Sequence, residues 1–299
     1  FHADLFTDYA MLFLQEHLAT TTNTPFFLYL PHTEPHFDLN APAENVARYR
    51  NTYANGWEQH RQQRFARQQA MGIVATNWAL SPPEHSYVWT NLPASEQDTQ
   101  DLAMATHSAE VDRVDWNVGR LVSFLQANNL YTNTLIFVLS DNGASNEGGN
   151  NGLATSLRIS TVGANWANTP FRLYKHYSHE GGISTPLIVH WPSGMKRSGE
   201  FDRRPGHISD LMATCVEVAG AEYPRGVLPL EATVTVFPEL PSALPWVMAR
   251  MPFWTVTLPL KVALPASSMP NVPSARLAPR RPTGRSTPIR SESSASRQA

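Results

Sequence analysis

Apolar residues form short runs and helical stripes that alternate along residues 1–224. The clearest run covers residues 134–139, where β-branched and large apolar side chains lead into Asp141, Asn142 and Gly143. A run of this length that ends at an Asn-Gly turn is typical of a buried strand. Ligands collect beyond the carboxyl ends of strands in open α/β sheets, so the Asp141 carboxylate and the Asn142 amide are candidates for a binding site. Turn chemistry alone would also explain this sequence.

Apolar side chains that recur every three to four residues predict helices. These helices cover residues 4–18, 97–128 and 208–219, and a helix over residues 57–75 is expected from a weaker pattern. In the first of them we expect Asp4 to cap the N-terminus and one apolar face to be buried. That face consists of Leu5, Tyr9, Leu12 and Phe13. In the long helix over residues 97–128, we expect an inward stripe that includes Val111 and an outward position for Arg113.

Two further apolar runs, over residues 25–30 and 183–191, are predicted strands. The first continues into a loop that contains two prolines together with His32 and His36, whose imidazoles are candidates for a site. Residues 143–168 are rich in Gly, Asn and Ser, and we expect them to form a flexible loop. The alternation of helices and strands predicts an α/β fold.

Charge and cysteine content exclude several classes of protein. The formal net charge is −2, so no general attraction to nucleic acid is expected. Residues 41–93 combine arginines with aromatic residues, but acidic residues dilute their charge, and we interpret them as a solvated insertion that shapes a substrate site. The single cysteine, Cys215, excludes an internal disulfide and favours core packing on an apolar helix face. No apolar stretch is long enough for a transmembrane segment.

The composition changes after residue 225. Residues 226–299 contain 12 of the 24 prolines and no Asp, with eight Lys or Arg against three Glu. From residue 266 onward, large apolar side chains are almost absent, so we expect this tail to be disordered or translated out of frame. The chain begins with Phe1 inside a predicted helix, and we expect it to be a fragment.

Six blocks of the sequence resemble the arylsulfatase family, and they occur in the order found in that family. They cover residues 25–36, 111–121, 139–144, 170–175, 180–183 and 185–192. The resemblance implies that residues 1–225 are part of a catalytic domain. It further implies an α/β alkaline-phosphatase-like fold, with a mixed sheet that is flanked by helices and incomplete at the N-terminus. A bound calcium ion and the hydrolysis of sulfate esters are the expected cofactor and activity.

The same resemblance implies roles for four residues. Asp141 and Asn142 match the pair that holds calcium in the family, and carboxylate and amide oxygens suit this hard cation. His36 matches a histidine that contacts the sulfate group, with His32 as its rival. Lys175 matches the sulfate-binding lysine, whose ammonium group would neutralise the ester oxygens as charge builds on the leaving group.

The chain departs from the family pattern at the nucleophile. The family uses a formylglycine made from Cys or Ser in a Cys/Ser-x-Pro-x-Arg motif near the N-terminus, beside paired aspartates. Neither element precedes Asp141, and Cys215 lacks the Pro and Arg of the motif. Residues 286–290 match the motif formally but lie at the wrong end of the chain. We therefore predict little or no sulfatase activity for this chain by itself.

Two alternatives to a sulfatase stay open. One is a phosphate or phosphonate ester hydrolase of the same superfamily, and the other is an inactive fragment that acts at most as a binding module. For a sulfatase, the expected partner is a small-molecule or glycan sulfate ester. The family further implies export to a periplasmic, secreted or lysosome-like location.

Overall fold

The computed structural model describes residues 1–21, 24–83, 88–146, 156–197, 199–222 and 247–251. The chain divides into two compact units, Phe1–Thr255 and Val256–Ala299, and every described residue belongs to the first. The α-helices are α1 (His2–Thr20), α2 (Ala43–Tyr49), α3 (Trp57–Ala70), α4 (Ala94–Ala127), α5 (Thr161–Ala167), α6 (Glu180–Ile183) and α7 (Ile208–Val218). Short 3₁₀ helices are η1 (Trp89–Asn91) and η2 (Tyr131–Asn133). The strands are β1 (Ile136–Leu139), β2 (Thr185–His190), β3 (Phe201–Pro205) and β4 (Val247–Met251).

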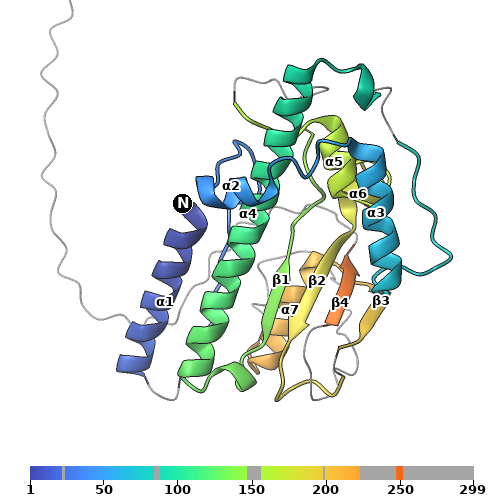
Figure 1. The fold of residues 1–299 in the computed structure, drawn as a ribbon. Helices are drawn as coiled ribbons and strands as arrows, with labels where there is room; N and C mark the ends of the chain where they lie inside the picture. The colour runs from blue at the N-terminus through green and yellow to red at the C-terminus, as the bar shows by residue number, and fades with distance from the viewer. Residues whose placement is uncertain (22–23, 84–87, 147–155, 198, 223–246, 252–299) are drawn as a thin grey trace, which may run out of the picture. The chain divides into compact units, whose positions relative to one another are not determined.

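The described strands form one mixed sheet in the order β1-β2-β4-β3 (Figure 1). β1 and β2 are antiparallel, with Ile136 opposite His190 and Leu139 opposite Leu187. β2 and β4 are antiparallel as well, whereas β3 and β4 are parallel. The strands predicted over residues 134–139 and 183–191 are confirmed, and the carboxyl end of β1 points toward α5 and α6 (Figure 1).

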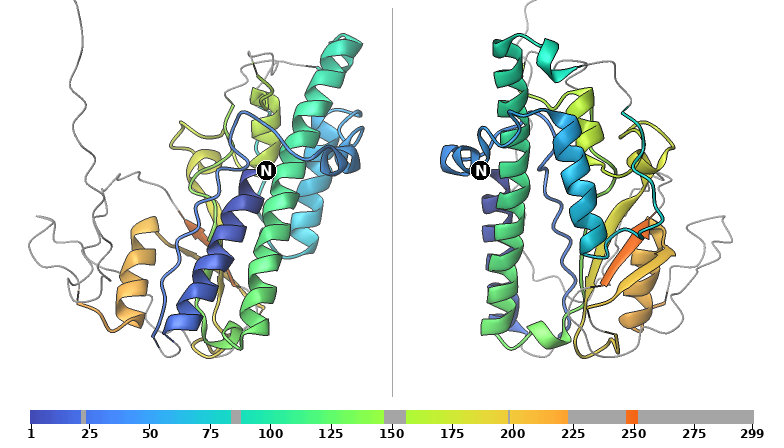
Figure 2. Two further views of the ribbon diagram at one scale, coloured as in Figure 1. Left: turned by 90° about the vertical axis from the view of Figure 1, so that its left-hand side faces the viewer. Right: turned by 45° about the vertical axis from the view of Figure 1, so that its right-hand side comes forward.

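Two apolar clusters hold the helices and the sheet together. The larger cluster contains Trp57 of α3, Met104 of α4 and Trp166 of α5. The smaller cluster packs Leu187 and Val189 of β2 against α7, with Leu211, Met195 and the apolar side chains of β1 around them. α3 and α7 lie on opposite sides of the sheet (Figure 2). The mixed sheet flanked by helices agrees with the predicted fold class.

The helix α1 exists as predicted, but the prediction of its buried face is wrong. The expected face of Leu5, Tyr9, Leu12 and Phe13 is 43–58% exposed, whereas Ala3, Thr7, Ala10 and Leu14 are buried. Small residues let α1 lie close to α4, where the Asp4 carboxylate accepts hydrogen bonds of 2.8–2.9 Å from Arg113 and Asn117. Phe1 is the N-cap, so the prediction of Asp4 as a cap is also wrong. Arg113 thus faces α1, and Val111 is 47% exposed, the reverse of what the α4 stripe predicted.

The strand predicted over residues 25–30 is not formed. Phe27 and Tyr29 are 68% and 77% exposed, while Phe26 and Leu28 are half-buried, so exposure alternates as it would along a strand. None of the described strands pairs with this segment. The apolar run therefore marked an extended segment, but a strand also needs a neighbour that completes its hydrogen bonds.

Several elements lie where the sequence predicted none, among them α5 and β4. Part of the expected loop over residues 143–168 is the helix α5, whose Ser160 cap accepts a hydrogen bond from the Gly163 amide at 3.3 Å. Residues 161–166 are all buried, so the sequence lacks the amphipathic pattern that would predict this helix. Within the expected tail over residues 226–299, the structure describes only β4, which differs from the expected lack of regular structure. Residues 286–290 lie outside the described residues.

The described helices include none with both the length and the apolar character needed to cross a membrane.

Candidate functional site

The carboxyl end of β1 carries two of the predicted site residues, Asp141 and Asn142. The Thr185 hydroxyl of β2 donates a 2.8 Å hydrogen bond to the Ser140 carbonyl and so fixes this end of the strand. The Asn142 amide nitrogen donates to the Asp141 carboxylate at 3.1 Å, and the Ser140 hydroxyl donates to the Asn142 carbonyl at 2.9 Å. Asp141 is exposed and Asn142 is half-buried. Both side chains therefore reach the surface at the sheet edge.

Glycines bring three backbone segments into direct contact beside this strand end. The Gly143 amide donates to the Gly182 carbonyl at 3.1 Å, and the Gly181 amide donates to the Arg172 carbonyl at 2.9 Å. A Cβ atom on Gly143 would lie 1.7 Å from the Gly181 carbonyl oxygen, and one on Gly181 would lie 2.0 Å from the Leu173 carbonyl oxygen. Only glycine fits at these two contacts, so Gly143 and Gly181 are required for the close packing of these segments.

The same contacts position Lys175. Its amide donates to the Ala144 carbonyl at 3.0 Å, two residues after Asn142. The Asn168 side chain bridges both segments, because its oxygen accepts from the Ala144 amide at 2.9 Å and its nitrogen donates to the Leu173 carbonyl at 3.2 Å. Leu173 and His176 have φ angles of 61° and 79°. Such left-handed backbone costs free energy in residues other than glycine, and it is concentrated at functional sites.

His36 and Lys175 are in direct contact although 139 positions separate them along the chain. The Lys175 Nζ atom lies 3.0 Å from His36 Nε2, and His36 Nδ1 lies 3.1 Å from the Phe37 carbonyl oxygen. A carbonyl only accepts and an ammonium group only donates. With Lys175 as the donor, Nε2 accepts in this contact, and Nδ1 is the ring atom that faces the Phe37 carbonyl.

Arg158 holds the loop that carries His36, and sequence reasoning missed this residue. Its guanidinium lies 4.1 Å from the ring centre of Phe37 and 3.2 Å from the Asp38 carboxylate. The backbone of Leu39 also donates to the Leu157 carbonyl at 2.9 Å. No local pattern could have indicated Arg158, because 120 positions separate it from Asp38.

A buried carboxyl group supports the far end of the same loop. Glu110 of α4 is 1% exposed, and its Oε1 atom accepts from the Asn40 amide at 2.7 Å. Burial raises the pKa of Glu110 to about 8, against the opposing effect of that hydrogen bond. Among the described residues, neither ring nitrogen of the rival histidine, His32, has a hydrogen-bond partner, and burial lowers the pKa of this residue. The structure thus places His36, and not His32, beside Lys175.

Asp141 and Asn142 form at most part of a calcium site. Calcium takes six to eight oxygen ligands, and this pair offers carboxylate and amide oxygens of the suitable kind. The hydrogen bond between the two side chains uses the amide nitrogen and one carboxylate oxygen. Among the described residues, no cluster of three or more His, Cys, Asp or Glu side chains could hold a metal ion. The donor set fits calcium in kind but is too small by itself.

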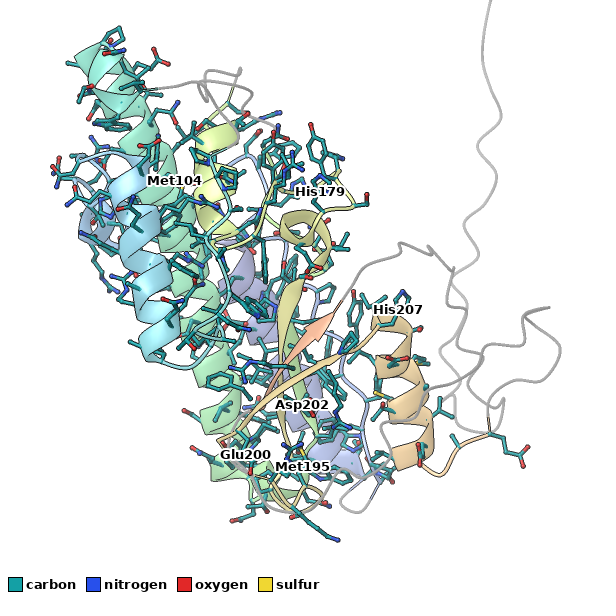
Figure 3. The ribbon with its side chains drawn as sticks, turned by 90° about the vertical axis from the view of Figure 1, so that its right-hand side faces the viewer. Met104, His179, Met195, Glu200, Asp202 and His207 are labelled. Carbon is teal, nitrogen blue, oxygen red and sulfur yellow. The ribbon has the colours of Figure 1, made fainter. Side chains whose placement is uncertain are left out.

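The arrangement gathers the predicted residues at one end of the sheet. Figure 3 shows His179, the N-cap of α6, at this end, whereas Met195 and Glu200 lie at the other. His36 and Lys175 form one contact, Asp141 and Asn142 form another, and the backbone hydrogen bond between Lys175 and Ala144 links the two segments. A cationic amine and a histidine beside hard oxygen ligands can bind an oxyanion. Their catalytic roles stay predictions.

Comparisons with known proteins give a consistent result. A model of the family named Sulfatase matches residues 2–221. An uncharacterized sulfatase of Schizosaccharomyces pombe is 28% identical over 225 residues, which cover 67% of this chain and 40% of that protein. An arylsulfatase of Klebsiella aerogenes is 29% identical over 224 residues, which cover 68% of this chain and 48% of that protein. The chain thus spans less than half the length of these two relatives.

Among solved structures, a protein of Bacteroides fragilis named as a candidate sulfatase superposes with a TM-score of 0.50 at 18% identity. The superposition covers 79% of this chain and 41% of the other. At this level of identity, the likeness concerns the fold alone. The fold agrees with the one that the sequence predicted.

Proposed function

Because the chain belongs to the sulfatase family, we propose that it forms part of a protein that hydrolyses sulfate esters and that it supplies groups that bind the sulfate. The 3.0 Å contact between His36 and Lys175 is the observation that carries this proposal. Two segments far apart in the sequence meet there, beside the strand end that carries Asp141 and Asn142. The proposed substrate is a small-molecule or glycan sulfate ester. Residues 41–93 would shape part of its binding site.

The proposed roles follow from charge. The Lys175 ammonium group would bind the negative oxygens of the ester and stabilise the charge that grows as the ester bond breaks. His36 would position the Lys175 ammonium group, which contacts its Nε2 atom, and it would bind a sulfate oxygen directly only when Nε2 carries a proton. The Lys175 amine supplies the positive charge of this pair, and this charge would attract an anion.

We further propose that Asp141 and Asn142 hold calcium together with ligands from elsewhere in the protein. When bound, the ion would supply positive charge beside the ester oxygens. The support is the chemistry of the two side chains and their place at the end of β1. Titration of the chain with CaCl₂ tests this role, because an ion that binds the folded state raises the unfolding temperature. We expect a rise that Asp141→Ala abolishes and that MgCl₂ does not reproduce.

The nucleophile of the family, a formylglycine, has no motif before Asp141 in this chain. The activity therefore has to be measured on a form of the protein that carries the Cys/Ser-x-Pro-x-Arg motif. We expect that form to hydrolyse an aryl sulfate with a higher kcat/KM than the matching aryl phosphate. A preference for the phosphate would support the alternative, an ester hydrolase of the same superfamily.

The second alternative is an inactive fragment that keeps only the fold. A folded chain that gains no stability from calcium, in a protein that turns over neither ester, would support this alternative. Turnover of the aryl sulfate combined with calcium-dependent stability would exclude it.

A further inference from the structure

The helices α3, α4 and α5 meet around the larger apolar cluster (Figure 1). Arg64 of α3 is half-buried at this junction, and its guanidinium carbon lies 4.8 Å from the centre of the Trp166 ring of α5. Among the described residues, none forms a hydrogen bond or an ion pair with this guanidinium. Arg64 belongs neither to the predicted sulfate-binding pair nor to the predicted calcium site.

The surroundings of Arg64 disfavour its charge. Burial lowers the pKa of Arg64, and the like charge of Arg67 lowers it further. The guanidinium nevertheless keeps its proton, as arginine does throughout proteins. Charges that lose water on folding are normally paired with an opposite charge, so an unpaired one marks a candidate site for an anion.

The carboxylate of Asp101 in the same region is already occupied. Asp101 of α4 is 3% exposed. It accepts hydrogen bonds from the Arg50 guanidinium at 2.7 Å, from the Asn51 amide at 2.9 Å and from the Tyr53 amide at 3.0 Å. Its negative charge therefore stabilises the segment around Tyr53 and leaves Arg64 without an acidic partner.

His107 of α4 gives Arg64 a neutral neighbour that can form hydrogen bonds. Burial and the charge of Arg64 lower the pKa of His107 to about 4, so its ring is neutral near pH 7 and offers one donor and one acceptor. No hydrogen bond joins this ring to another described residue. His60 Nε2 is unpaired but enclosed, whereas the unpaired nitrogens of Arg64 and His107 reach accessible surface. A ligand can therefore contact both groups.

Aromatic side chains fix the positions of these two groups. Tyr53 is 4% exposed and meets Trp166 edge-on, with ring centres 5.2 Å apart. The Tyr53 hydroxyl lies 2.5 Å from the hydroxyl of Ser108, the residue after His107. Trp166 in turn supports the Arg64 guanidinium. The groups are therefore preorganised, which lowers the entropic cost of binding.

We propose that Arg64 and His107 bind an oxyanion, namely a carboxylate, sulfate or phosphate group of a small molecule. The planar guanidinium presents paired N–H donors that match two oxygens of such a group. The neutral His107 ring can donate to a further oxygen without adding a second charge. Arg67 is exposed one turn further along α3 and adds to the positive potential. The proposal does not depend on sulfatase activity, because it rests on α3, α4 and α5.

Isothermal titration calorimetry on the complete chain tests the proposal, with sodium sulfate, phosphate and acetate as probes at constant ionic strength. We expect at least one probe to bind, and Arg64→Gln to weaken that binding about tenfold or more, because charge-assisted hydrogen bonds are lost. His107→Phe keeps an aromatic ring but removes the N–H donor, so it should weaken binding about threefold or more. Unchanged binding in either variant would overturn the proposal.

Arg67→Gln is the matched control, because Arg67 is exposed on the same helix. It should weaken binding by less than about twofold, since exposed charges act through a screened field. Equal losses in Arg64→Gln and Arg67→Gln would identify an adventitious ion only and overturn the proposal. Without a probe, Arg64→Gln should unfold at the same or a higher temperature than the wild type, because it removes an unpaired charge. A clear drop would show that the protein already pairs Arg64.

Two further measurements separate the possible occupants. Absence of binding by every probe would overturn the proposal and leave water as the occupant. In the form that carries the nucleophile motif, the binding that depends on Arg64 should remain. Its loss there would identify a carboxylate of the protein itself as the partner of Arg64 and would also overturn the proposal.

Lys175→Ala separates this site from the proposed sulfate site. The binding that depends on Arg64 should persist in this variant, because Lys175 is not part of the junction between α3, α4 and α5. Binding that Lys175→Ala abolishes and Arg64→Gln leaves unchanged would overturn the present proposal. That result would leave the proposed sulfate site intact, so the two proposals can fail separately.

Discussion

The contact between His36 and Lys175 joins two of the predicted site residues. The imidazole lies between the Phe37 carbonyl on one edge and the Lys175 ammonium group on the other. An ammonium group has three N–H donors, so Lys175 can keep its contact with His36 and still donate to a sulfate oxygen. His36 would therefore act as a partner that orients the lysine.

Glu110 predicts a dependence of stability on pH. Burial raises its pKa in the folded protein to about 8 from the ordinary 4.5. The folded state thus binds the proton more tightly than the unfolded state, so the free energy of unfolding falls as the pH rises from about 4.5 to 8. This span of pKa corresponds to a loss of up to about 5 kcal/mol.

Glu110→Gln removes the titration and keeps an oxygen that can accept from the Asn40 amide. Urea unfolding at pH 5 and at pH 9 measures the effect. We expect the variant to lose less stability than the wild type between these two pH values. Equal losses in both proteins would show that Glu110 does not titrate in this range.

At the scale of elements, the loop over residues 31–40 depends on contacts from distant segments. Arg158 stacks on Phe37 and pairs with Asp38, directly beside His36. Arg158→Ala should therefore loosen the loop and displace His36. In the form that carries the nucleophile motif, we expect kcat for an aryl sulfate to fall about tenfold or more, since small misplacements of positioning groups are costly.

Hydrogen exchange in residues 36–40 should become faster in the same Arg158→Ala variant, as a readout that does not depend on turnover. Arg48→Ala is the matched control, because Arg48 is exposed and its 3.0 Å ion pair with Asp112 belongs to the surface. If both variants reduce kcat equally, Arg158 has no special role in placing His36.

The sequence predicted where helices and strands form better than it predicted which of their faces are buried. Periodicity identified α1, α4 and α7, and apolar runs identified β1 and β2, because the local sequence pattern reports secondary structure directly. It could not tell which side of α1 meets α4, since small residues and the pair of Asp4 with Arg113 form that interface in place of large apolar side chains. Glu110 was also missed, because its burial depends on distant segments.

The sequence also predicted the site only in part: it indicated the site residues but not the backbone contacts that position them. Resemblance supplied His36, Lys175, Asp141 and Asn142, and the structure brings His36 to Lys175 and Asp141 to Asn142. The left-handed backbone at Leu173 and His176 could not be predicted, because residues other than glycine adopt that conformation only rarely. Gly143 and Gly181 were visible in the sequence, but the close contact that requires them depends on the folded chain.

For the whole molecule, the incomplete metal site and the absent nucleophile motif predict a separation of binding from turnover. The chain as it stands should gain stability from calcium or from sulfate, yet it should not hydrolyse an aryl sulfate above the background rate. Thermal unfolding with each ion, together with a turnover assay on the same sample, measures both. Turnover that Asp141→Ala abolishes would contradict this prediction.

The most direct test of the proposed sulfate site is a double-mutant cycle on His36 and Lys175, in the form of the protein that carries the nucleophile motif. Each of His36→Ala and Lys175→Ala should lower kcat/KM for an aryl sulfate by about 10² or more, whereas Lys196→Ala at an exposed position should not. Because the two side chains are in contact, kcat/KM of the double variant should be little lower than that of the less active single variant. Losses that multiply, or variants that keep full activity, would contradict the account.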